Sequence, residues 1–150
     1  MSVSFVDIDW AGRPVRIEHA WIAGDAAAPL LVFLHEGLGS ATMWRDFPQR
    51  LCAAVGCRGL VYSRPGYGNS SAPVDAAGDM EVWDGQFMAH QAEQVLPALL
   101  KALGVDTAKN PPWLLGHSDG GSIALLFAAA FPSQVAGVAV VAPHIMVEEL

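Results

Sequence analysis

Charged residues are scarce in this chain: they make up 15% of its 150 residues, against about 25% in an ordinary soluble domain. Basic residues are the rarer kind, because 8 Lys and Arg stand against 15 Asp and Glu, for a net charge of −7. This balance argues against nucleic acid and against an anionic membrane surface as partners. Hydrophobic residues reach 53%, which strands buried on both faces explain in part. We expect the remaining hydrophobic residues to include surface that another segment covers.

Several other signals are missing. No stretch approaches the ~18 apolar residues of a membrane span. The start, Met1 to Trp10, has acids and lacks a basic segment followed by an apolar one, so we expect no secretory signal and a cytoplasmic protein. Two cysteines without such a signal, Cys52 and Cys57, are expected to be reduced core residues. No metal-ligand spacing or phosphate-binding loop is found, so we expect neither a metal nor another cofactor.

The apolar segments that are present indicate an α/β fold. After a hairpin, strands alternate with helices, which predicts one domain with a mostly parallel sheet and helices on both faces. Pro97 lies inside the longest helix, so we expect a kink or two abutting helices there. In chain order the expected elements are a hairpin of Val3–Ile8 and Val15–Ile22 around a turn at 11–14, strand Leu30–Leu34, helix Trp44–Cys52, strand Gly59–Tyr62, helix Met80–Leu103, strand Trp113–Gly116, helix Ser122–Phe131 and strand Gly137–Ala142.

The most informative motif is Gly116-x-Ser118-x-Gly120, because an apolar strand precedes it and a helix follows at once. This spacing turns the backbone so sharply that the hydroxyl of Ser118 stands above the sheet edge. We expect glycine at both flanking positions because a Cβ would clash there and because glycine tolerates strained dihedral angles. A serine that only caps the helix is the alternative interpretation of this pattern. The order strand, turn, helix favours a catalytic nucleophile instead.

Together with two further motifs, this turn resembles the α/β-hydrolase family of small serine hydrolases, which includes esterases, lactonases and carbon–carbon bond hydrolases. The motifs are His35 to Gly39 after the third strand and Arg64 to Ser70 after the fourth. The resemblance covers nearly the whole chain, but only the amino-terminal half of the family's domain. It implies an α/β-hydrolase-type sheet with an amino-terminal antiparallel hairpin, incomplete at the carboxyl-terminal side.

The resemblance also implies roles for single residues. The backbone N–H groups of Gly37 and Asp119 would be the oxyanion donors for Ser118. Glu36 stands where the family usually has glycine; it would either contact substrate or, as we prefer, accept hydrogen bonds from nearby loop amides. His35 is expected to brace this loop rather than to catalyse. The segment from Arg64 is expected to be a structural turn below the active site.

Three more residues carry open alternatives. The carboxylate of Asp119 either stabilises the first helical turn or pairs with a cationic substrate such as an amino-acid ester, as in relatives that resemble valacyclovir hydrolase. His117 is expected to point away from the pocket, into the sheet packing. His144, just past the final strand, is better placed than His117 to act near Ser118, because it lies beside the edge where ligands bind in parallel sheets, and we expect it to bind substrate. Glu148 and Glu149 follow, and a solvated acidic run is the preferred interpretation of them.

The family orders its triad as serine, acid, histidine, and the last two would lie beyond Leu150. We therefore expect a chain that is nearly inert unless a second segment completes it. The apolar edge Gly137–Ala142 should pair with a later segment or with a second copy. The leading hypothesis is a serine hydrolase of a small-molecule ester or related acyl bond. The alternative is a non-catalytic half-domain that binds a partner or a ligand through its sheet edge.

Overall fold

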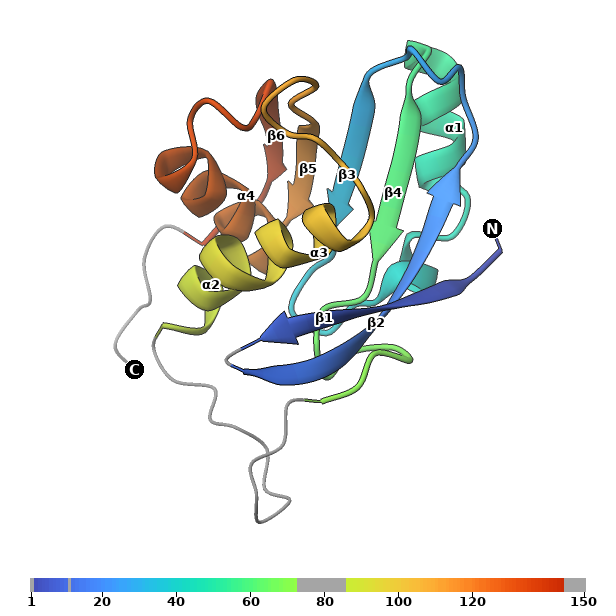
Figure 1. Ribbon diagram of the computed structural model, residues 1–150. Helices are drawn as coiled ribbons and strands as arrows, with labels where there is room; N and C mark the ends of the chain where they lie inside the picture. Colours follow the sequence, from blue (N-terminus) through green and yellow to red (C-terminus); the bar gives the residue numbers. More distant parts are fainter. Residues whose placement is uncertain (1, 11, 73–85, 145–150) are drawn as a thin grey trace.

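One mixed β-sheet organises the molecule (Figure 1). The computed structural model describes residues 2–10, 12–72 and 86–144. Within these ranges the spatial order of the strands is β1-β2-β4-β3-β5-β6. The strands are β1 (Ser4–Trp10), β2 (Arg13–Ile22), β3 (Leu30–Leu34), β4 (Arg58–Tyr62), β5 (Trp113–His117) and β6 (Gly137–Val141). Each expected strand is present, with ends that differ by one or two residues.

The pairing confirms the expected fold class. β1 and β2 are antiparallel, as are β2 and β4, whereas β4, β3, β5 and β6 run parallel to their neighbours. The hairpin turn is tighter than the expected one at 11–14, because Arg13 and Pro14 already pair with β1. Pro14 fits because β4 pairs only with the other end of β2, from His19 to Ile22, so its missing N–H costs no ladder bond on that side.

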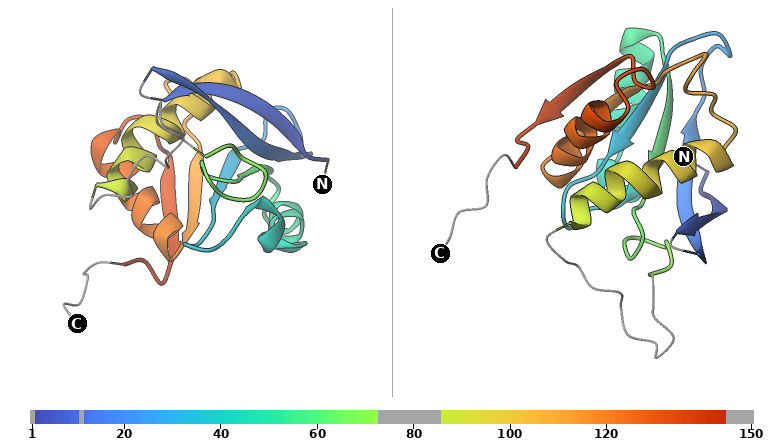
Figure 2. Two further views of the ribbon diagram at one scale, coloured as in Figure 1. Left: turned by 90° about the horizontal axis from the view of Figure 1, so that it is seen from below. Right: turned by 60° about the vertical axis from the view of Figure 1, so that its left-hand side comes forward.

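Helices cover both faces of the sheet, as Figures 1 and 2 show. The 3₁₀ turn η1 (Ala41–Trp44) and helix α1 (Phe47–Val55) replace the single helix expected over Trp44–Cys52. Gly56 ends α1 in the left-handed conformation, with φ of 69°, which glycine adopts without strain. The other face carries α2 (Phe87–His90), α3 (Leu96–Ala102) and α4 (Asp119–Ala130).

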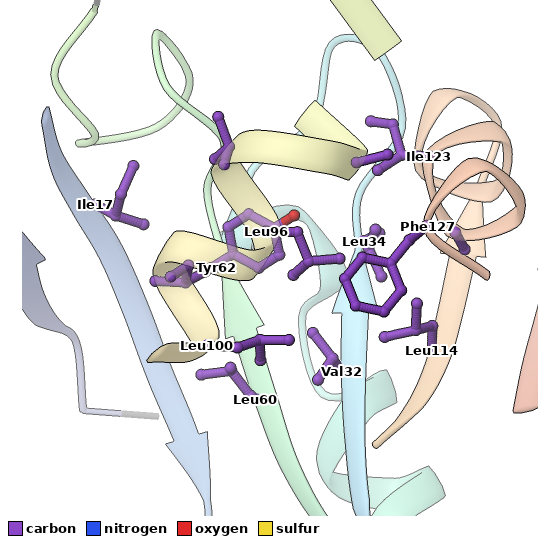
Figure 3. Close-up of a cluster of buried hydrophobic side chains, with 14 of the residues drawn as sticks. Ile17, Val32, Leu34, Leu60, Tyr62, Leu96, Leu100, Leu114, Ile123 and Phe127 are labelled. Carbon is purple, nitrogen blue, oxygen red and sulfur yellow. The ribbon is translucent and has the colours of Figure 1, made fainter. Parts of the chain in front are cut away.

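Two apolar cores hold these layers together. The larger one joins β3, β4 and β5 to α3 and α4, and Figure 3 shows Val32, Leu60, Leu96, Leu114 and Phe127 converging in it. The smaller core lies under α1 and contains both cysteines, which are buried and free. Alternate residues of β4 serve the two cores, since Leu60 faces α3 and Val61 faces α1. This alternation fixes which side chains can reach the sheet edge.

At Pro97 the structure agrees with the expectation of abutting helices, because helix α3 begins at Leu96 with Pro97 in its first turn. The first part of the expected helix, Met80 to Gly85, lies outside the described residues. From Phe87 onward the backbone stays helical through a π-helical turn, η2 (Gln91–Val95), and α3 follows directly. A proline ring clashes with the carbonyl four residues earlier in a regular α-helix. The wider π turn just before Pro97 relieves that clash, because its hydrogen bonds span five residues.

β6 forms one border of the described sheet and pairs with β5 alone. Its Val141 is 56% exposed, and none of its residues is fully buried. No helix within the described ranges is both long and apolar enough to cross a membrane.

Candidate active site

Ser118 occupies a strained backbone position between β5 and α4. Its φ is 52° and its ψ is −120°, a region that a residue with a Cβ rarely adopts. Its own N–H donates to the carbonyl of Val141 at 2.9 Å, and its carbonyl accepts from the N–H of Gly121 at 2.8 Å. The strain is therefore held from both sides, by β6 and by the first turn of α4. Such strain in a folded protein clusters at functional sites.

The two glycines of the motif are required for space. A Cβ on Gly116 would lie 2.2 Å from the carbonyl oxygen of Gly120, and a Cβ on Gly120 would lie 2.1 Å from that of Leu34. The expected clash is thus confirmed. The expectation that these glycines also carry strained dihedral angles is wrong, because neither has a positive φ and Ser118 carries it instead.

The N–H groups of Gly37 and Asp119 have no acceptor among the residues that the structure describes. Asp119 begins α4, where the first N–H groups of a helix lack intrahelical partners. Gly37 lies against the same residue, since a Cβ added to it would come within 2.7 Å of Asp119 Oδ2. Two unpaired donors thus lie in neighbouring segments beside Ser118, which suits the stabilisation of a developing oxyanion.

Glu36 belongs to the loop itself. Its Oε2 accepts a hydrogen bond from the N–H of Leu38 at 2.6 Å, and its carbonyl accepts from the N–H of Gly39 at 3.1 Å. This agrees with the interpretation of Glu36 as a loop carboxylate that binds nearby amides. The same turn leaves Leu38 91% exposed.

His35 is buried beneath this loop as a neutral ring. Its Nε2 accepts the backbone N–H of Arg64 at 3.0 Å, so its proton is on Nδ1, which donates to the carbonyl of Glu36 at 2.7 Å. Burial, and then the positive charge of Arg64, lower the pKa of His35 to about 3, against a smaller opposing effect of the Glu36 bond. A ring with both nitrogens engaged braces the loop, as expected, and has no free base to offer.

Sequence reasoning missed the buried charge of Arg64. This residue is fully buried, and its guanidinium donates to the carbonyls of His35 and Glu36. It stacks 4.8 Å from the ring centre of Tyr67, and its Nη2 lies 3.9 Å from Oδ2 of Asp119. The arginine stood in a glycine-rich turn that we assigned a structural role, and no sequence signal placed its side chain under the oxyanion loop.

A second buried charge supports the same turn. The carboxylate of Glu18 accepts hydrogen bonds from Ser63 Oγ at 2.6 Å and from the side chain of Asn69 at 2.6 Å. Burial would raise the pKa of Glu18, but the bonds from the Asn69 backbone, Ser63 and the Asn69 side chain lower it below its usual value. Gly68 lies so close that a Cβ would be 2.4 Å from Glu18 Oε2. The turn after β4 is thus fixed from below by an ionised carboxylate.

His144 comes from the segment after β6 and meets Ser118 directly. Its Nε2 lies 2.9 Å from Ser118 Oγ and 3.4 Å from Asp119 Oδ1. Ser122 Oγ holds the backbone of His144 through its N–H and carbonyl, both at 2.9 Å. In a Ser-His-Asp triad the acid binds the other ring nitrogen. Serine and carboxylate share one nitrogen here, so these three residues do not have the triad arrangement.

His117, which we expected to point away from the pocket and into the sheet packing, is half-buried. It borders a hollow of about 220 Å³ between the oxyanion loop and η1, together with His35, Glu36, Met43 and Trp44. Glu148 and Glu149 lie outside the described residues. Within the described ranges no three His, Cys, Asp or Glu side chains gather as a metal site.

Comparisons with known proteins agree with the overall fold. Residues 29–150 match the family model described as alpha/beta hydrolase fold. The sequence is 31% identical over 129 residues to the sn-1-specific diacylglycerol lipase ABHD11 of Mus musculus, covering 86% of this chain and 37% of that protein. It is 30% identical over 134 residues to a 2-hydroxy-6-oxononadienedioate/2-hydroxy-6-oxononatrienedioate hydrolase of Klebsiella pneumoniae, covering 88% of this chain and 41% of the relative.

A solved structure extends the agreement to three dimensions. A probable hydrolytic enzyme from Pseudomonas aeruginosa superposes with a TM-score of 0.74 at 26% identity, covering 95% of this chain and 41% of that structure. The chain therefore spans about two fifths of the length of these relatives. Because the family model matches most of its residues, the chain belongs to the alpha/beta hydrolase fold family.

Proposed function

We propose that this chain carries the nucleophile and the oxyanion hole of a serine hydrolase that acts on a small ester or a related acyl bond. The observation that carries the proposal is the backbone of Ser118, held at φ 52° beside two N–H donors that have no acceptor among the described residues. In this mechanism Ser118 Oγ attacks the acyl carbon. The amides of Gly37 and Asp119 then stabilise the resulting alkoxide, at about 3–4 kcal/mol per donor. The lipase and the oxo-acid hydrolase similar to this chain support a hydrolytic reaction.

The base that activates Ser118 is proposed to come from outside the 150 residues. His144 touches the serine, but the carboxylate of Asp119 lies beside the same ring nitrogen. In a Ser-His-Asp triad the acid binds the other ring nitrogen and orients the imidazole toward the serine. The chain spans about two fifths of its relatives' length, which agrees with a base and an acid supplied by a further segment.

Covalent labelling tests this proposal. A fluorophosphonate should label Ser118 in the protein that the complete gene encodes, and peptide mapping should find the adduct on that residue. Ser118→Ala should abolish it, while Ser122→Ala, which removes a neighbouring hydroxyl, should leave labelling of Ser118 detectable. Lack of any label on the folded, full-length protein would exclude the serine mechanism.

The exposed border of β6 supports the second function class, a non-catalytic half-domain that binds a partner strand. A strand edge with free N–H and C=O groups is a template for pairing. Sedimentation of the 150-residue chain discriminates the two classes: a tight dimer favours binding through the edge, and a stable monomer of 15.8 kDa argues against it.

A further inference from the structure

Nη2 of Arg64 faces both halves of the proposed oxyanion hole. It donates to the carbonyl of Glu36 at 3.0 Å, and it lies 3.9 Å from Oδ2 of Asp119. The first contact is to the loop after β3, the second to the first residue of α4. These segments are far apart in the sequence, so the buried guanidinium is a direct link between them.

The Glu36 carbonyl shares a peptide group with the N–H of Gly37. A trans peptide is planar, so its carbonyl and its N–H point in opposite directions. Arg64 Nη2, His35 Nδ1 and the N–H of Gly39 all donate to this carbonyl, at 3.0, 2.7 and 3.1 Å. Three donors on one oxygen fix the orientation of the peptide plane. The Gly37 N–H must then point away from Arg64 and His35.

The charge of Arg64 also acts on the strength of that donor. A cation at a carbonyl oxygen polarises the peptide, and hydrogen bonds in a chain strengthen one another by an estimated 10–30%. The positive charge lies in a fully buried position, where water screens it little. A buried cation is costly unless it is paired. The carbonyls of His35 and Glu36 accept from the two terminal nitrogens and Asp119 supplies an opposite charge, while Nε has no hydrogen-bond partner among the described residues.

Asp119 supplies the second contact and the second donor. Its carboxylate is 19% exposed and faces Arg64 with one oxygen, while its backbone N–H begins α4. The Cβ position of Gly37 is 2.7 Å from this carboxylate. Attraction between the two charges therefore draws the start of α4 against the loop and sets how far apart the two N–H groups lie.

We propose that Arg64 is the positioning residue of the oxyanion hole: its guanidinium orients the peptide that carries the Gly37 N–H and ties it, through Asp119, to the start of α4. The inference rests on the proposed serine hydrolase function, but its geometry can be tested apart from it. Arg64 touches neither substrate nor Ser118 in this account. It acts only through the groups it holds.

The test uses Arg64→Lys in the full-length protein. Lysine keeps the charge, but its ammonium is a compact point charge that lacks the planar fork of the guanidinium, so it cannot hold both carbonyls and face Asp119 as well. We expect the second-order rate of Ser118 phosphonylation to fall 10- to 100-fold. The ¹H–¹⁵N resonance of Gly37 should shift and broaden. Arg50→Lys is the matched control, because the Arg50 side chain is 80% exposed and its Nη1 lies 3.9 Å from the similarly exposed carboxylate of Asp46, just before α1; it should change neither readout.

If Arg64→Lys does not fold, Asp119→Asn tests the same link by removing the carboxylate while leaving all donors to Glu36 in place. We expect a several-fold slower phosphonylation and a shifted Gly37 resonance. A lower melting temperature with wild-type phosphonylation and an unmoved Gly37 resonance would show a merely structural arginine and overturn the inference. If wild-type Ser118 does not react at all, the proposed function fails, and the Gly37 resonance alone decides the role of Arg64.

Discussion

The hydroxyl oxygen of Ser118 lies 2.9 Å from Nε2 of His144, and a carboxylate oxygen of Asp119 lies 3.4 Å from the same nitrogen. In a Ser-His-Asp triad the carboxylate binds the other ring nitrogen, which orients the imidazole toward the serine. Here the hydroxyl and the carboxylate both lie beside one nitrogen. The contact between Ser118 and His144 therefore has the distance of a nucleophile–base pair without its charge arrangement.

Replacement of His144 by glutamine should consequently have a small effect. We expect phosphonylation of Ser118 to slow by less than 10-fold, whereas loss of a true histidine base costs about 10⁶-fold in kcat. The rate with a fluorophosphonate at fixed pH measures this directly in the full-length protein. A loss of several orders of magnitude would make His144 the base and contradict our account of the shared nitrogen.

The strained backbone of Ser118 predicts an effect on stability. The free energy of unfolding of Ser118→Gly should exceed that of Ser118→Ala by about 1 kcal/mol. Glycine relieves backbone strain of about 1–3 kcal/mol, and its greater conformational freedom in the unfolded chain offsets part of that gain. Urea titration of both variants measures the difference. Equal stabilities would show that the positive φ of 52° is not retained when the hydroxyl is removed.

The space at Gly120 predicts a much larger loss. Gly120→Ala should destabilise the protein by at least about 3 kcal/mol, because the new methyl would meet backbone, which cannot move aside. Gly56→Ala is the control: nothing lies within 4 Å of its Cβ position, so only its left-handed φ of 69° costs about 1–2 kcal/mol. The two free energies of unfolding, measured by denaturant titration, should differ accordingly.

The buried imidazole of His35 predicts a pH dependence of stability. Its folded pKa is lowered to about 3, and its unfolded value is about 6.5. Between these values the unfolded chain binds the additional proton, so stability should fall as pH is lowered from 6.5 towards 3. His35→Gln should show a shallower fall over this window, seen by urea titration at pH 6.5, 5.5 and 4.5. Identical slopes would mean that His35 is protonated in the folded protein.

The carboxylate of Asp119 predicts substrate preference, if it meets a cationic group on the substrate. Asp119→Asn should then lower the ratio of kcat/KM for amino-acid esters to that for plain acyl esters by about 10-fold, the loss of one charge contact at a partly buried carboxylate. The ratio cancels any effect on the oxyanion hole that both substrates share. An unchanged ratio would leave the pairing with Arg64 at 3.9 Å as the carboxylate's role.

Much of the architecture could be predicted because burial imposes simple patterns. Continuous apolar runs such as Leu30–Leu34 predicted the strands, and the glycine spacing around Ser118 predicted the sharp turn. The loop role of Glu36 also agrees with the preferred interpretation of the sequence. These features depend on neighbours within a few residues, which a sequence displays directly.

The charged layer beneath the site could not be predicted in the same way. Arg64 meets Glu36 and Asp119 only after the strands are placed side by side, and no local pattern encodes such contacts. The π turn before Pro97 depends likewise on packing. The motif predicts a sharp turn, but it does not show which residue of the turn has the strained dihedral angles. We therefore expected strain at Gly116 and Gly120, whereas the structure places it at Ser118.

The π turn has a consequence for how the long helix tolerates insertions and deletions. Its buried positions Gln91, Val95 and Leu99 recur every four residues, more than the 3.6 of an α-helical turn. In an uninterrupted α-helix this stripe would rotate away from the sheet by about 40° per turn. Deleting one residue from Gln91–Val95 would restore ordinary winding and leave the preceding segment, from Phe87 to His90, on nearly the same side of the axis, because a π turn covers with one extra residue about the rotation of an α turn. The helix can therefore lose one residue here and keep the same side toward the sheet.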